Sequence, residues 1–278
     1  MTVNGTTGAP ILRPEDVADL LIKPTQRASV AMQAATVVDT ASRTYRIPIV
    51  NTDPATAWVN EGDEIALSDP ALGELRIVPA KLAGITAITS ELAGDSSPEA
   101  AQAVGNGLAR DLAKKIDRSF FGATLSAPAP PGLPAVTGVG TVAGGYDNVD
   151  WAAAAISQAQ VVGTELTSFA ASPATALKLA TIKSGTNFNT PLLGQDPTVP
   201  TRRTVQGLPI LVSEFIADNI VWGIPAERAV IVVRQDATVE TSRDALFTSD
   251  RLAVRAIMRV SWGFPHAEAI QKVTLDDE

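Results

Sequence analysis

The residue types that perform most enzyme chemistry are scarce in this chain of 278 residues. His266 is the only histidine, and cysteine is absent. A Ser-His-Asp triad would therefore have to use His266 as its base, and a zinc or iron site would lack its ordinary ligands. His266 lies in the sequence Phe264-Pro265-His266-Ala267, near the end of the chain. A structural histidine explains this position better than a catalytic base, so we predict no enzymatic activity, no cofactor and no metal.

Two further motifs could bind an ion or a phosphate. Asp147, Asn148 and Asp150 could supply oxygen ligands to calcium, but their spacing does not match an EF-hand loop, and a helix cap explains them better. The glycines of residues 138–145 do not have the spacing of a dinucleotide-binding motif, and no Gly-Lys pair of a P-loop occurs anywhere in the chain. We interpret residues 127–145, which are rich in glycine and proline, as a flexible loop.

The composition favours association over binding to nucleic acid or membrane. The net charge is -8, whereas a protein that grips nucleic acid needs clustered cations. Charged residues make up only 19% of the chain, against roughly 25% in typical soluble domains. The uninterrupted apolar runs are far shorter than the about 20 residues of a membrane-spanning helix. The apolar surplus is therefore expected in a core or between subunits, and association is the simpler interpretation.

A long two-stranded excursion is predicted in the first third of the chain. Residues 28–50 alternate in a β-rich pattern, residues 51–54 form a turn signal, and a second strand is expected at 75–78. A lone hairpin is only marginally stable in water. Its Trp58 and Ile65 need a partner surface, which we expect a neighbouring subunit to provide.

One long helix and one long strand are the most regular elements. Apolar residues recur on one face of residues 98–121, with a capping box at Ser96 and Glu99 and Gly122 after the end. The charged residues of this helix are assigned to its other faces, Asp117 among them. Residues 252–262 alternate strictly between apolar and other side chains, as in a strand with one apolar face. Both elements would be about 36 Å long, so they can lie along each other.

Shorter elements are expected in the remaining segments. Helices are predicted at 13–22, from a cap near Asp150 to Leu166, and at 172–183. Strands are predicted at 210–212 and 229–233, and residues 186–206 are interpreted as a loop.

Three passages together resemble the major capsid proteins of tailed bacteriophages, the family whose fold is named after phage Hong Kong ninety-seven. The first passage is similar to that family's extended loop and its return, and it consists of Ala57-Trp58-Val59-Asn60-Glu61-Gly62 with Lys81-Leu82, Ser90-Glu91-Leu92 and Asp95-Ser96. The second is similar to the end of the family's spine helix, and it consists of Ile116-Asp117-Arg118 with Phe120-Phe121-Gly122. The third is similar to the C-terminal part of the family, and it consists of Gly207-Leu208-Pro209-Ile210 with Phe247, Asp250, Val254-Arg255, Arg259 and Pro265-His266-Ala267.

The resemblance covers residues 28–275 and implies an α+β fold with an N-terminal arm, an extended β-hairpin loop, a peripheral domain and an axial domain. The peripheral domain of this fold is built on a long spine helix and a long strand. The implied boundaries are an arm at 1–27, the first peripheral part at 28–147, the axial domain at 148–245 and the peripheral C-terminal strand at 246–278. Within the first peripheral part, the extended loop spans 44–80 and the spine helix 98–121.

The same resemblance implies a structural protein that self-assembles into hexamers and pentamers of an icosahedral shell. Such a shell encloses the double-stranded DNA genome of a tailed phage without sequence-specific binding, and it is assembled in the host cytoplasm to become part of the virion. The implied partners are other copies of the chain, with a separate scaffolding protein, a portal and decoration proteins as further candidates. No membrane partner is implied.

Seven residues are candidates for contacts between subunits, because they combine a large or charged side chain with a place on the loop, the spine helix or the last strand. They are Trp58, Glu61, Arg110, Lys114, Arg118, Arg255 and Arg259. Two alternatives stay open at this point. The charges on the helix can form a solvated face instead of salt bridges to neighbours, and Trp58 can pack inside its own subunit.

Two departures from the family pattern limit what the resemblance implies. The capsid-like part begins almost at Met1, so scaffolding is expected from a separate protein, or the chain is a shortened form. Some family members crosslink through a lysine in the extended loop, whereas residues 44–80 contain no lysine. An encapsulin-like bacterial compartment is the alternative within the same fold, and a small hydrolase that uses His266 is the alternative from another class.

Overall fold

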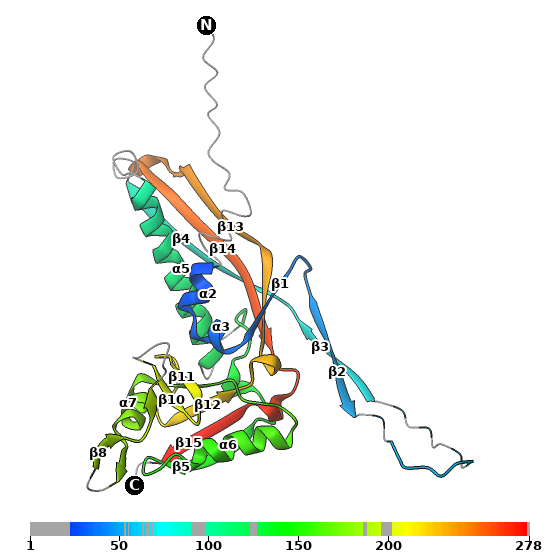
Figure 1. The fold of residues 1–278 in the computed structure, drawn as a ribbon. Coiled ribbons are helices and arrows are strands. Elements are labelled where there is room, and N and C mark those ends of the chain that lie inside the picture. The colour runs from blue at the N-terminus through cyan, green and yellow to red at the C-terminus, as the bar shows by residue number, and fades with distance from the viewer. Residues whose placement is uncertain are drawn as a thin grey trace.

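Two β-sheets with their helices form the body of the molecule, and a two-stranded hairpin extends from it (Figure 1). The computed structural model describes residues 23–52, 54, 56–62, 64, 67, 69, 71–89, 98–122, 127–185, 188–195 and 202–276. Within this part of the chain, no helix combines the length and the apolar character needed to cross a membrane. Because helices and β-sheets occur together in the body, the α+β architecture predicted from the sequence is present.

The first sheet has four strands in the order β1-β13-β14-β4. They are β1 (Thr36–Thr40), β13 (Val230–Leu246), β14 (Arg251–Gly263) and β4 (Ala80–Thr89). β1 is parallel to β13, and the other pairs are antiparallel. The predicted alternation of residues 252–262 is thus confirmed as β14, which has a paired strand on each side.

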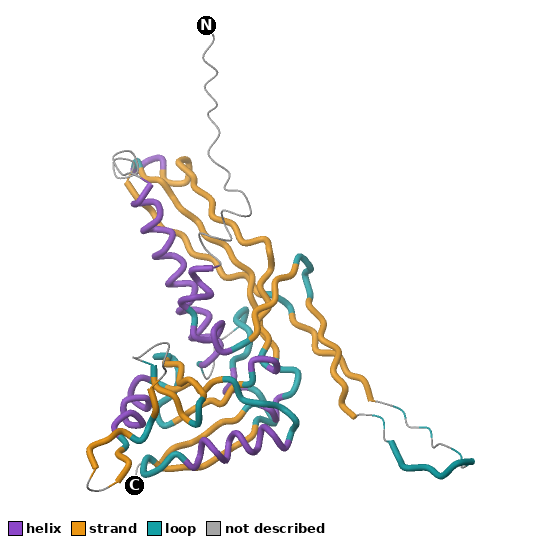
Figure 2. The backbone as a smooth tube through the Cα atoms, in the orientation of Figure 1, coloured by secondary structure: helices purple, strands orange, loops and turns teal. Residues whose placement is uncertain are grey.

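The helix α5 (Pro98–Phe121) lies along one face of this sheet, as Figure 2 shows, and its bounds match the predicted spine helix. Its apolar residues Ala109 and Leu112 pack with Ala256 of β14. At its C-terminal end, the ring of Phe120 contacts the ring of Trp262 edge-on, at 5.5 Å between centroids. The predicted capping box at Ser96 and Glu99 lies outside the residues that can be described in side-chain detail.

The second sheet has seven strands in the order β5-β15-β12-β6-β11-β10-β9. They are β5 (Gly140–Gly145), β15 (Gln271–Asp276), β12 (Ile220–Ile224), β6 (Ser168–Ala171), β11 (Leu208–Val212), β10 (Arg203–Val205) and β9 (Gly194–Gln195). Two helices lie beside this sheet, α6 (Asp150–Val161) and α7 (Pro173–Thr181). A separate two-stranded sheet is formed by β7 (Lys183–Gly185) and β8 (Phe188–Pro191). The side chain of Ser172 caps α7 by accepting from Thr175 N at 3.1 Å.

The interpretation of residues 127–145 as a flexible loop is wrong for its last part, which forms β5. This strand pairs in parallel with β15, the last strand of the chain. Its glycines reflect close packing: a Cβ added to Gly144 would lie 2.6 Å from the Cβ of Trp151 on α6. The predicted loop at 186–206 likewise contains the short strands β8, β9 and β10. These strands are too short to show a period in the sequence.

The sheets divide the chain differently from the expected boundary at residue 245. β13 belongs to the first sheet from residue 230 onward, because it pairs with β14 from Val230 to Leu246 and with β1 over its first five residues. The last strand, β15, belongs to the second sheet and lies between β5 and β12. The expected peripheral segment 246–278 therefore contributes to both sheets, since the chain returns to the second sheet after β14.

The hairpin predicted from the sequence is confirmed as β2 (Tyr45–Thr52) and β3 (Ala71–Ile77), which pair antiparallel. At its base, Ile77 packs against Val230 and Val232 of β13. Beyond that base the hairpin extends away from the body (Figure 1).

Two short helices, α2 (Lys23–Ala28) and α3 (Val30–Ala34), precede the first sheet. The alternation predicted from residue 28 is wrong here, because strand structure begins only at Thr36. The hydroxyl of Thr25 donates to the carbonyl of Ala109 on α5 at 3.4 Å. The described end of the expected N-terminal arm thus packs on the spine helix, while the helix predicted at 13–22 lies outside the described residues.

The carboxylate of Asp117 on α5 holds the start of α3 in place. Its oxygens accept from the Ser29 hydroxyl at 2.6 Å, Val30 N at 3.0 Å and Ala31 N at 2.9 Å. Asp117 is buried, so its assignment to a solvated helix face is wrong. Burial raises the pKa of Asp117 above the ordinary value of 3.8, although the hydrogen bonds from Ser29, Ala31 and Val30 act to lower it.

Replacing Asp117 with alanine leaves the Ser29 hydroxyl and two backbone N–H groups without their acceptor. Because buried unsatisfied groups are costly, we expect Asp117→Ala to lower the free energy of unfolding by about 2–4 kcal/mol. Urea unfolding of the dissociated chain, followed by circular dichroism, measures this change. Asp111→Ala, at an exposed position of the same helix, is the control and should stay within about 0.5 kcal/mol of wild type. Equal stability of the two variants would contradict the role of Asp117.

The raised pKa gives this prediction a pH dependence. The folded chain protonates Asp117 more readily than the unfolded chain, so the stabilisation linked to this group is fully present below the unfolded pKa. It is lost as the pH rises through the folded pKa. Asp117→Asn does not titrate at this position, so the Tm of wild type relative to this variant should increase as the pH falls from neutral. A difference that stays constant or decreases would contradict the raised pKa.

Candidate interaction surfaces

Trp58 lies in the segment that joins β2 to β3, and its side chain is fully exposed, with 106% of its reference area accessible. The alternative that it packs inside its own subunit is wrong for the isolated chain. Other apolar side chains of the hairpin are also exposed, above all Leu67 at 93% and Leu72 at 72%. Sequence reasoning missed these two leucines, although they occur in the same excursion. Each of these three side chains is thus left uncovered by the chain itself.

The distal part of the hairpin is acidic. Glu61 lies in a turn beside Gly62, whose φ of +94° favours glycine. Glu61, Glu64 and Asp69 are all exposed. Residues 53–70 contain five acidic residues and no lysine or arginine. We call residues 53–70 the hairpin tip; it combines negative charge with the exposed indole of Trp58.

The candidate cations on α5 are exposed, and they are not all equivalent. Arg110, Lys114 and Arg118 lie on the outer side of the helix. Lys114 already has a partner within the chain, since its Nζ lies 3.4 Å from Oε1 of Glu214. An ion pair this exposed contributes little to stability. Lys114 can therefore exchange Glu214 for a carboxylate of another subunit at small cost.

The two candidate arginines of β14 lie on the face of the first sheet that is opposite to α5. Arg255 is ion-paired with Glu240 across the β13–β14 ladder. Arg259 lies directly between Arg234 of β13 and Lys81 of β4 in the register of the sheet. The structure thus brings Arg259 together with two cations that sequence reasoning did not connect with it.

The residues that could have supported catalysis do not form a catalytic arrangement. His266 is half-buried and precedes the 3-10 helix η5 (Ala267–Ala269), where its backbone oxygen accepts from Ala269 N. In the described part of the chain, no serine or carboxylate is hydrogen-bonded to its imidazole. Asn148 accepts from Asp150 N at 3.0 Å and donates to Asp147 at 3.1 Å just before α6. The N-cap of this helix is Val149, which makes no side-chain cap hydrogen bond, so the predicted side-chain cap is wrong. No group of three or more metal-ligating side chains occurs within the described residues.

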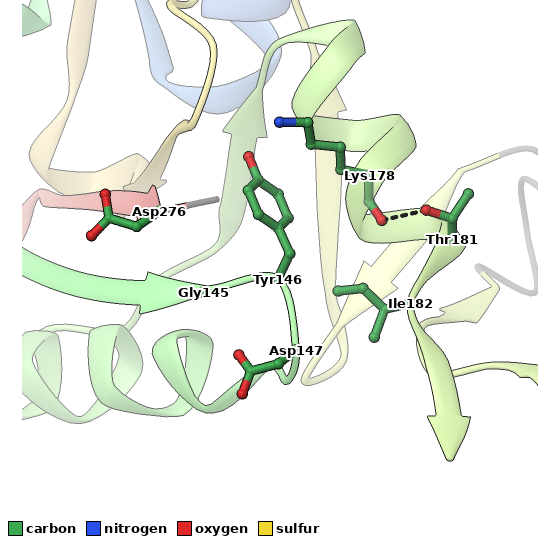
Figure 3. Close-up of a pocket in the computed structure, with 7 residues that line it drawn as sticks. All are labelled: Gly145, Tyr146, Asp147, Lys178, Thr181, Ile182 and Asp276. Carbon is green, nitrogen blue, oxygen red and sulfur yellow. Dashed lines mark hydrogen bonds between the residues drawn. The ribbon is translucent and has the colours of Figure 1, made fainter. Parts of the chain in front are cut away.

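A polar pocket of about 400 Å³ lies at the end of β5 and β15, beside α7 (Figure 3). The hydroxyl of Tyr146 donates to Oδ1 of Asn219 at 2.7 Å, and Lys178 Nζ lies 3.3 Å from the same oxygen. The ammonium also lies 4.9 Å from the centre of the Tyr146 ring. In Figure 3 the carboxylates of Asp147 and Asp276 lie on different sides of Tyr146 and do not converge. The two carboxylates therefore do not form a pair in this pocket.

A second, more apolar pocket of about 210 Å³ lies between α5 and the loop at residues 128–130. Ile116, Val260 and Trp262 form part of its wall, and Lys81 and Lys115 also line it. Sequence reasoning missed this pocket, because its walls come from segments far apart in the chain.

Comparisons with known proteins agree with this geometry. A family model described as the Phage capsid family matches residues 11–275. No curated protein sequence matches the chain. Among solved structures, that of Mycobacterium phage Bobi has a TM-score of 0.70 at 17% identity and covers 100% of this chain and 95% of that one. The structure of Mycobacterium phage Adephagia has a TM-score of 0.69 at 19% identity, and the match covers 89% of this chain and 90% of that one.

A structure described as the capsid of a native GTA particle is similar in the same way. Its TM-score is 0.69 at 18% identity, and the match covers 99% of this chain and 95% of that one. At such identities these structures show a shared fold, which confirms the fold predicted from the sequence. Since the family match spans nearly the whole of this chain, the chain belongs to the phage capsid family.

Proposed function

We propose that this chain is the major capsid protein of a tailed phage, and that its copies assemble as hexamers and pentamers of an icosahedral shell around double-stranded DNA. The observation that carries the proposal is the uncovered hairpin: Leu72 is exposed on β3, and Trp58 and Leu67 are exposed in the segment that joins β2 to β3. A hairpin of this kind needs a second surface to be stable. In a shell, the neighbouring subunit supplies that surface.

The gain from covering Trp58 is large enough to matter. A tryptophan buries about 150–250 Å², which corresponds to about 4–6 kcal/mol of transfer free energy before the costs of association are subtracted. Every copy of the chain carries the same hairpin. The gain is therefore repeated at each contact in a shell, and modest individual contacts suffice for a stable particle.

The remaining features fit a structural role. The net charge of -8 suits a shell that encloses DNA without gripping it. We further propose assembly in the host cytoplasm, with a separate scaffolding protein, a portal and decoration proteins as additional partners.

Electron microscopy of the expressed protein tests the proposal directly. We expect hexamers, pentamers or closed shells, alone or together with the other structural proteins of the phage, and DNA inside particles from infected cells. A monomer that persists at high concentration, with no particles even when those proteins are present, would refute it. Shells that enclose a protein cargo and no DNA would instead favour an encapsulin-like compartment.

The four tryptophans give a sensitive readout of assembly. Trp151, Trp222 and Trp262 are buried, at 2%, 1% and 7% of their reference areas, whereas Trp58 is fully exposed. Assembly should therefore shift the emission to shorter wavelength and reduce quenching by acrylamide through Trp58 alone. Trp58→Ala should keep its circular dichroism but assemble about thirtyfold more weakly, since truncating an interface tryptophan commonly costs about 2 kcal/mol.

Trp58→Phe is the matched control for this variant. It keeps an aromatic ring at the interface, so it should assemble nearly as wild type does, while the change in emission disappears. Normal particle yield and heat resistance of Trp58→Ala would contradict the interface role.

The subunits should not become covalently linked through the hairpin. An isopeptide bond needs a lysine amine held at the interface, and residues 44–80 contain no lysine. Mature particles boiled in detergent are expected to run as one band near 28.9 kDa. A ladder of multiples would show that another lysine, such as Lys81, forms a crosslink.

A further inference from the structure

The apolar pocket between α5 and the loop at residues 128–130 is built from parts of the fold that other contacts hold in place. We call this pocket, lined by residues 80–82, 115, 116, 119, 128–130, 260 and 262, the Trp262 pocket; its volume is about 210 Å³. The indole Nε1 of Trp262 donates to the carbonyl of Pro131 at 2.6 Å. Gly132 packs on the end of α5, where an added Cβ would lie 2.4 Å from the carbonyl oxygen of Ser119. The pocket is therefore preformed, as small-molecule sites usually are.

The lining of the Trp262 pocket separates apolar from charged side chains. Ile116, Val260 and Trp262 are buried and form an apolar wall, whereas Lys81 and Lys115 are exposed. No carboxylate occurs among the described residues that line the pocket. Within the described part of the chain, neither lysine ammonium forms an ion pair. The pocket is therefore complementary to a molecule with an apolar body and a negative charge.

The side-chain donors of the lining indicate the same class of ligand. The Ser119 hydroxyl already donates to the carbonyl of Lys115 at 2.8 Å, and the N–H of Trp262 is used within the chain as well. The ammonium groups of Lys81 and Lys115 are thus the donors that remain for a ligand. Lys81 can border the pocket because β4 is the edge strand of the first sheet. A carboxylate suits two ammonium groups, because charge-assisted hydrogen bonds are stronger than neutral ones.

The volume of the pocket limits the apolar part of the ligand to about two rings. A cavity of about 150 Å³ holds benzene, so the about 210 Å³ of the Trp262 pocket exceeds what one ring needs. Pockets for drug-sized molecules begin at about 300 Å³. An α-helix of a partner protein, about 10 Å across with its side chains, is too wide to enter. Trp262 favours an aromatic body, because aromatic rings gain from packing against one another.

We propose that the Trp262 pocket binds a small aromatic carboxylate, with the ring system against Trp262 and Ile116 and the carboxylate between Lys81 and Lys115. The proposal goes beyond the shell function and does not depend on it, because every lining residue belongs to one chain. A simple acid of this class with two rings is 2-naphthoate, which serves as the probe.

Isothermal titration calorimetry of the dissociated chain with 2-naphthoate tests the proposal. The matched neutral probe is 2-naphthylmethanol, which has the same ring system and carries no charge. Naphthoate should bind about tenfold more tightly than the alcohol, and added salt should reduce this difference. Equal affinities of the two probes, or no binding of naphthoate, would overturn the proposal.

The role of the lysines is tested by a double variant at exposed positions. Lys81→Gln with Lys115→Gln should remove the preference for naphthoate and leave the affinity for the alcohol unchanged. Lys114→Gln is the matched control, because Lys114 is exposed on the same helix and does not line the pocket. This control should keep the preference. A preference that persists in the double variant, or that is lost in Lys114→Gln, would place the recognition of charge elsewhere and contradict the proposal.

Filling the pocket tests the position of the ring system. Ala129 lines the pocket, so the larger side chain of Ala129→Leu should weaken the binding of both probes about tenfold, with unchanged circular dichroism. Undiminished binding would show that the probes bind elsewhere on the surface. The lysine variants change exposed positions only, so they decide the matter even where Ala129→Leu does not fold.

The same titration on assembled particles separates a small-molecule site from a contact between copies. Binding of naphthoate to particles as well as to the dissociated chain supports the proposal. Binding to the dissociated chain alone would assign the pocket to a contact between copies and overturn it. Failure of the chain to form particles at all would instead count against the proposed shell function, while the calorimetry of the dissociated chain still decides the fate of the pocket.

Discussion

The buried carboxylate of Asp117 is the interaction on which the arrangement of the molecule depends. It accepts three hydrogen bonds from Ser29, Val30 and Ala31, and so holds α3 at the end of the spine helix. The core at this point joins both sheets, since Trp222 of β12 and Trp262 of β14 pack in the same cluster as Phe120. β1, the next element after α3, pairs in parallel with β13, and the chain then continues into the hairpin. The Asp117 carboxylate thus fixes α3, the element that directly precedes β1 and the hairpin.

The distribution of apolar side chains separates the roles of body and hairpin. The body buries three of the four tryptophans, and its small residues allow close contacts, as between Gly144 and Trp151. The hairpin instead exposes Trp58 and two leucines. The low content of charged residues thus has two physical causes, a core that spans two sheets and a projecting surface that is suited to burial by a partner.

Long periodic elements could be predicted from the sequence, because period and length together determine them. The helix at 98–121 and the strand around 252–262 are examples, and so is the pairing of the hairpin. Contacts between distant segments could not be predicted. Asp117 contacts Ser29 across 88 residues, and the alignment of Arg234, Arg259 and Lys81 depends on the register of three strands. The glycine-rich strand β5 has no apolar period, because its glycines serve the close approach of α6.

The proposed cover of the hairpin by a neighbouring subunit has a consequence for symmetry. The hairpin and the surface that covers it are different parts of the chain, so the contact is heterologous, and each copy both donates a hairpin and accepts one. Repetition of a heterologous contact closes into a ring when the rotation between copies divides a full turn. Because the hairpin joins the body only at its base, a small change of its angle alters that rotation. The proposed pentamers and hexamers can thereby share one kind of contact.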